Sequence, residues 1–68
     1  MTGYKLLLVS AVGKRDGMAL ELAEESGEQV AEVFEDSATK ARTVRFFVDR
    51  PVPLEVVEWF LAEAARGL

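Results

Sequence analysis

Cysteine and histidine are both absent from the 68 residues of this sequence. Without cysteine the chain can form no disulfide, no thiolate nucleophile and no thiolate metal site. The absence of histidine removes the commonest general base and the commonest side-chain ligand for metals. We therefore expect that the chain has no catalytic activity of its own, no metal site and no cofactor.

Long hydrophobic runs are missing as well. The longest apolar run covers residues 6–9, whereas a membrane-spanning helix needs about 20 apolar residues. The residues after Met1 also lack the apolar stretch and small-residue cleavage site of a secretory signal. These observations predict a cytoplasmic protein that does not enter a membrane.

Basic residues are the minority, with eight Lys and Arg against twelve Asp and Glu, a net charge of −4 and a pI of about 4.7. This balance disfavours nucleic acid as a partner, because nucleic-acid-binding domains usually have a pI above about 9. The charges are unevenly distributed: residues 18–39 contain seven acidic residues and no basic one, whereas residues 40–50 contain four basic residues and one acidic one. We expect this polarity to be a feature of the surface.

Half of the residues are hydrophobic, which predicts a folded chain rather than a disordered one. A chain of this length forms one domain, here residues 1–68. A core of this size rarely supplies more than about 3–5 kcal/mol, and small domains usually add a disulfide, a metal or a second subunit. Because the first two are excluded, we expect a homodimer.

Turn signals divide the first half of the chain into short apolar segments. Residues 4–12 are rich in Leu and Val and predict a strand that is apolar on both faces. The Asp16-Gly17 pair that follows is typical of a tight hairpin turn, because glycine accepts a positive φ. Later, residues 35–41 predict a loop and residues 42–49 predict a strand, since apolar and polar side chains alternate there.

Residues 18–36 fit two descriptions. As one helix, they would place apolar side chains on one side and glutamates on the other. As two strands, they would turn at Ser26-Gly27 and return over residues 28–34. We favour strands, because a glycine inside a helix costs about 1 kcal/mol and because the helical alternative leaves an isolated two-stranded sheet, which is marginal in water.

A helix is predicted from Leu54 onward, after Pro51 and Pro53 have ended the sheet. Its apolar side chains recur at helical spacing over about half of its circumference, Pro53 presets its first turn, and Gly67 predicts its end. The predicted fold class is α+β, a four-stranded antiparallel meander with this helix packed on one face. The alternative is a β-α-β-α fold in which residues 18–36 are helical.

Five residues are candidates for binding a partner. Trp59 falls beside the charged side of the helix, where it either covers the edge of the core or anchors a partner. Phe47 would face away from the helix, and Arg45 lies next to aromatic side chains in the basic segment. Glu28 and Glu32 belong to the acidic segment, which could bind a basic protein partner.

These observations favour a small homodimeric interaction or regulatory module that associates through the sheet face opposite the helix. One alternative is a nucleic-acid-associated protein that uses a basic patch at residues 40–50. Another is an accessory subunit of a larger enzyme whose catalytic groups lie on another chain.

Overall fold

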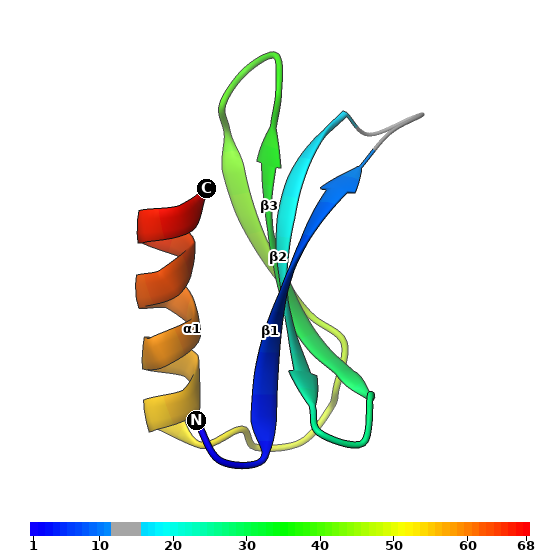
Figure 1. Ribbon diagram of the computed structural model, residues 1–68, viewed down its shortest axis with the longest axis vertical. Helices are drawn as coiled ribbons and strands as arrows, with labels where there is room; N and C mark the ends of the chain where they lie inside the picture. Colours follow the sequence, from blue (N-terminus) through cyan, green and yellow to red (C-terminus); the bar gives the residue numbers. More distant parts are fainter. Residues whose placement is uncertain (12–15) are drawn as a thin grey trace.

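The computed structural model describes residues 1–11 and 16–68 (Figure 1). Its elements are, in order, β1 (Tyr4–Ala11), β2 (Gly17–Glu24), β3 (Gln29–Asp36), β4 (Arg42–Phe46) and α1 (Leu54–Gly67). The strands form one antiparallel sheet in the order β1-β2-β3-β4, and α1 lies along one face of it (Figure 1). The predicted α+β meander is confirmed, and the alternative with a helix over residues 18–36 is wrong.

The turn between β2 and β3 explains why residues 18–36 form two strands. Gly27 has a φ of +104°, which glycine adopts without the steric cost that a Cβ brings. Its N–H donates to the Glu24 carbonyl at 2.8 Å, and the Glu24 N–H donates to the Glu28 carbonyl at 2.9 Å. The Ser26-Gly27 signal in the sequence therefore marks the turn correctly.

The β1–β2 pairing has an unbroken register from Tyr4 opposite Glu24 to Ala11 opposite Gly17. Residues 12–15, which include the last residue of the predicted first strand, lie outside the described residues. Gly17 is buried, and a Cβ there would overlap the Glu35 carbonyl oxygen and lie 2.8 Å from Cζ of Phe34. This position therefore requires glycine because a side chain has no room.

Two predicted boundaries are wrong. The third strand continues to Asp36, so the loop predicted over residues 35–41 begins later. The last strand was expected over residues 42–49 but ends at Phe46. Beyond it the Phe47 N–H still donates to the Val30 carbonyl at 2.8 Å, and Val48 packs against the core, so the chain is already leaving the sheet toward α1.

The core lies between α1 and one face of the sheet. The helix contributes a narrow buried stripe at a spacing of four residues: Val56, Phe60 and Ala64. The sheet contributes side chains from its two inner strands: Leu20, Leu22, Val30, Ala31 and Val33. The apolar arc predicted over half of the helix is therefore only partly buried, and Leu54 and Leu61 remain exposed.

The ends of α1 follow from local chemistry. Pro53 is the residue before the helix, with φ −53° and ψ 133°, and the helix begins at Leu54 as predicted. The Pro53 carbonyl accepts the N–H groups of Val56 and Val57 at 3.0 and 3.2 Å. Glu55 in the first turn and Arg66 in the last match the helix dipole.

Candidate interaction surface

The face of the sheet that carries α1, called here the helix side, is wider than the helix that covers it. Residues directly opposite in an antiparallel pair share a face, so Leu8 lies on the helix side with Leu20, and Val44 and Phe46 lie there with Val33 and Ala31. All three of these edge-strand side chains are exposed, by 57% for Leu8, 51% for Val44 and 44% for Phe46. The core under the helix includes the two inner strands and reaches the start of β1, where Tyr4 and Leu6 pack against it, but it leaves these three positions open.

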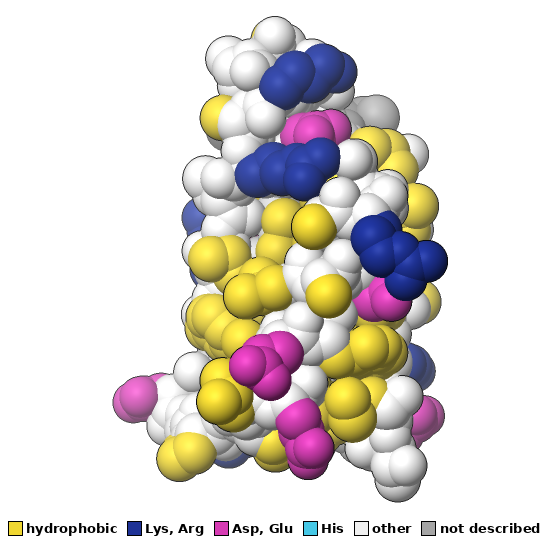
Figure 2. All heavy atoms as spheres, turned by 90° about the vertical axis from the view of Figure 1, so that its left-hand side faces the viewer, with side chains coloured by type: hydrophobic (Ala, Val, Ile, Leu, Met, Phe, Trp, Pro, Cys, Tyr) yellow, Lys and Arg dark blue, Asp and Glu magenta, His cyan; other side chains and the backbone are white. Residues whose placement is uncertain are grey.

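The surface view from the helix side shows the result. Hydrophobic side chains reach the surface in several places along and beside the helix, between scattered charged groups (Figure 2). The exposed apolar residues of the helix itself are Leu54 and Leu61. The apolar arc of α1 is thus shared between the core and this surface.

The opposite face of the sheet, called here the far face, is partly closed by its own side chains. Ala19, Ala23 and Phe34 are buried there, although they are not part of the core under α1. On this face the exposed apolar side chains are those of the edge strand β1, namely Leu7 and Val9. The far face is therefore less apolar than the sequence suggested.

A row of polar side chains also crosses the middle of the far face. Glu21 on β2 lies opposite Glu32 on β3, and Glu32 lies opposite Arg45 on β4. Of the predicted partner-binding residues, Glu32 and Arg45 are thus brought together in neighbouring strands. This arrangement allows the carboxylates and the guanidinium to partner one another within the chain.

The aromatic candidates lie at different places. Trp59 is half-buried and packs against the core cluster at the side of α1, so it covers the edge of the core. Phe47 is exposed and directly follows β4.

The basic segment is largely matched to the acidic one inside the molecule. The Arg50 guanidinium donates to Glu24 at 2.6 Å and to Glu28 at 2.8 Å, which joins the β2–β3 turn to the connection before α1. These carboxylates, with the hydrogen bond to Glu28 foremost, hold the pKa of Arg50 above its ordinary value. Glu28, predicted to bind a partner, is thus already engaged by Arg50.

Arg42 is engaged in a similar way at the other end of the sheet. Its Nε donates to Glu35, the residue opposite it in the register, at 3.0 Å. Its Nη2 donates to the Leu68 carbonyl at 2.6 Å, which holds the end of the chain against β4. Two of the four basic residues in the predicted patch therefore have acidic or carbonyl partners in the same chain.

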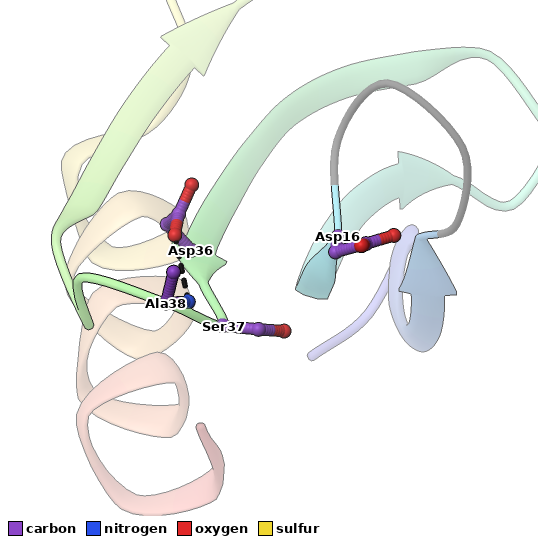
Figure 3. A pocket seen from close by; sticks show the side chains of 4 residues that line it. All are labelled: Asp16, Asp36, Ser37 and Ala38. Carbon is purple, nitrogen blue, oxygen red and sulfur yellow. Dashed lines mark hydrogen bonds between the residues drawn. The ribbon is translucent and has the colours of Figure 1, made fainter.

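A shallow hollow of about 370 Å³ is lined by Asp16, which precedes β2, and by Asp36, Ser37 and Ala38 at the end of β3 (Figure 3). The two carboxylates point in different directions in this view. Asp36 accepts the Ala38 N–H at 2.8 Å and the Thr39 N–H at 3.0 Å. These backbone donors, Thr39 foremost, lower the pKa of Asp36 below its ordinary value of 3.8, so this carboxylate serves to shape the turn.

The structure also bears on sites for other ligands. Within residues 1–11 and 16–68, no three carboxylates lie close enough to hold a metal ion. Among the described residues, Ser10 Oγ donates to Met18 Sδ at 3.5 Å, and a thioether does not act as a base. In the described part of the chain, no helix is both long enough and apolar enough to cross a membrane.

Comparison with known proteins gives no further guidance on the site. No protein-family model matches the chain, and no match was found among curated proteins or solved structures.

Proposed function

We propose that this chain is a cytoplasmic homodimeric interaction module without catalytic activity of its own. The observation that supports the proposal is the exposure of large apolar side chains on both edge strands, Leu7, Leu8 and Val9 on β1 and Val44 and Phe46 on β4. Large exposed apolar patches on a soluble protein usually mark an interaction surface. We propose a second copy of the chain as the partner that binds this surface, because association would stabilise so small a fold.

The size of the core supports the choice of a second copy. Of the described residues, eleven hydrophobic ones are buried, eight of them in the core under α1, and the largest fully buried side chains are those of Leu22, Val30 and Phe60. A core this small supplies about 3–5 kcal/mol at most, and no disulfide is available. Binding to a second folded copy adds stability by mass action, which makes association part of the fold's stability.

The internal ion pairs favour this proposal over binding to nucleic acid. Nucleic-acid affinity depends on cations that neutralise phosphates and release counterions. Arg42 and Arg50 are already held by Glu35, Glu24 and Glu28 at 2.6–3.0 Å. The charge at residues 40–50 thus serves to join segments of the chain, which leaves the apolar edges as the better candidate surface.

Light scattering on the eluate of a size-exclusion column tests the proposal across a dilution series. We expect twice the chain mass of 7.5 kDa at micromolar concentration and the chain mass at high dilution. A mass of one chain throughout the series would refute the homodimer. A chain that remains a monomer throughout the series and shows salt-dependent retention on a heparin column would support the nucleic-acid alternative instead.

A further inference from the structure

The two edge strands of the sheet differ in how well they are protected against pairing with another strand. β1 has eight residues, a continuous register with β2, no proline and one charged residue, Lys5. β4 has five residues, two of them arginines, and ends where the chain turns toward α1. Short length and charged side chains are the usual protection of a natural edge strand, so β4 is protected and β1 is open.

The chemistry of β1 also suits a second copy of itself. A two-fold axis normal to the sheet places two β1 strands antiparallel and keeps both helices on the same side. Residues directly opposite each other must lie on the same face of the sheet. Leu7 therefore lies opposite Leu7 of the second copy, or Leu8 lies opposite Leu8 of the second copy. In each case the other leucine lies opposite a residue two positions away in the strand. Whether the pairing centres on Leu7 or on Leu8, the single charged residue of the strand, Lys5, faces a residue other than Lys5.

We propose that two copies of this chain join through their β1 edges to form one continuous eight-stranded antiparallel sheet. This inference rests on the proposed homodimer and specifies how its subunits meet. Joining the edges brings the exposed Leu8 side chains together on the helix side and the Leu7 side chains together on the far face. The contact uses the same surface patch on both subunits and therefore closes after two copies.

Stacking of the far faces is the competing arrangement, and it is disfavoured by charge. Glu21 and Glu32 lie in the middle of that face, and stacking would remove both carboxylates from water in each copy. Arg45 lies beside Glu32 in the same row, and even for a paired charge the cost of removal from water can exceed the gain from the pair. Edge pairing leaves this polar row open to solvent while it covers the apolar strand.

A matched pair of substitutions tests the inference. Leu8→Lys and Val44→Lys change exposed aliphatic side chains on the helix side of the two edge strands, where each side chain is more than half exposed in the single chain. We expect Leu8→Lys to raise the dimer dissociation constant by about 100-fold or more, because it is present twice and each copy weakens binding about tenfold. Val44→Lys should leave the constant within about threefold, and circular dichroism checks that both variants remain folded.

Cross-linking provides a second readout that does not depend on affinity. The chain has no cysteine, so each of the variants Leu7→Cys, Leu8→Cys and Val44→Cys carries a single thiol. A disulfide needs Cα atoms about 4.4–6.8 Å apart, which opposed residues of neighbouring strands satisfy. Mild oxidation should link two chains at Leu7→Cys or Leu8→Cys and not at Val44→Cys.

The outcomes separate this inference from the proposed function. A wild-type chain that is monomeric at all concentrations overturns both. A wild-type dimer that resists Leu8→Lys, or that Val44→Lys dissociates as strongly, overturns the edge pairing and leaves the homodimer standing. Oligomers larger than two that both variants disrupt would indicate β1 pairing with β4 of the next copy, which also overturns the two-fold arrangement.

Discussion

Leu8 lies directly opposite Leu20 in the β1–β2 register, yet 57% of Leu8 is exposed and only 8% of Leu20. The two side chains have the same chemistry and point to the same face. The difference arises because Leu20 lies on an inner strand in the core under the helix, whereas the part of the edge strand that carries Leu8 is left open. This contrast is the physical basis of the interaction surface that we propose.

Gly17 provides a test of packing on the far face. A Cβ at this position would overlap the Glu35 carbonyl oxygen and press on the Phe34 ring, so we expect Gly17→Ala to lower the free energy of unfolding by about 3 kcal/mol. The matched control is Gly67→Ala, where a Cβ meets no atom within 4 Å and alanine favours the helix by up to about 1 kcal/mol. Urea denaturation measures the free energy of unfolding of both variants. If the two variants are equally stable, the close packing described around Gly17 is contradicted.

Phe60 and its neighbour Leu61 test how the helix divides between core and surface. Phe60 is fully buried, whereas 43% of Leu61 is exposed. Phe60→Ala should cost about 3–5 kcal/mol, which approaches the whole stability of a domain this small, so the variant should be largely unfolded. Leu61→Ala should cost less than about 1 kcal/mol. Thermal unfolding followed by circular dichroism distinguishes them, and a larger loss at Leu61 would contradict the orientation of α1.

Lys40 tests the backbone of the β3–β4 connection. Its φ is +65°, a region in which a Cβ is disfavoured and glycine is not. Lys40→Gly should therefore raise the free energy of unfolding by about 0.5–1 kcal/mol. Lys40→Ala removes the same charge but keeps the Cβ, so it should give no such gain. Both variants are compared with the wild-type chain by chemical denaturation, and an equal gain in both would assign the effect to charge.

Asp36 predicts a specific response to acid. Because the N–H groups of Thr39 and Ala38 lower its pKa below 3.8, its stabilising contribution is fully present above pH 3.8 and is lost as the pH falls through the lower folded value. In Asp36→Asn, the amide oxygen can still accept hydrogen bonds from these N–H groups, but the side chain no longer titrates. We expect the stability of the variant to fall less steeply than that of the wild type below about pH 4.

Urea denaturation over a series of acidic pH values measures this response. Asp49→Asn is the control, because in the described structure no hydrogen bond to the Asp49 side chain is found. The control should follow the wild-type profile. If the stability of Asp36→Asn falls with pH as steeply as that of the wild type, the proposed contribution of the Asp36 carboxylate to the turn is wrong.

The elements of the fold could be predicted because their signals are local. Ser26-Gly27 marks a turn through the positive φ of Gly27, and this one feature decides between two strands and one helix. The helix from Leu54 follows from the prolines before it and the periodic apolar residues within it. Such signals depend only on residues close in sequence, so these elements can be predicted without the tertiary structure.

The surface could be predicted only in part, because it depends on contacts between distant segments. Alternation correctly groups Val44 with Phe46, but the sequence does not reveal that α1 leaves both exposed. The pairing of Arg50 with Glu24 and Glu28 depends on the path of the chain between β4 and α1. The need for glycine at position 17 arises from β3, far along the chain, so a turn signal alone could not reveal it.

Amide hydrogen exchange in β1 as a function of protein concentration tests the central claim most directly. Backbone N–H groups that point outward from an open edge exchange readily with solvent, whereas those paired with a second β1 are protected. Dimerisation also stabilises every part of the fold by mass action. We therefore predict that residues 42–46 gain only this shared protection as the concentration rises through the micromolar range, whereas the outward-pointing N–H groups of residues 4–11 gain more. Exchange in β1 that is equally fast at every concentration would contradict the account.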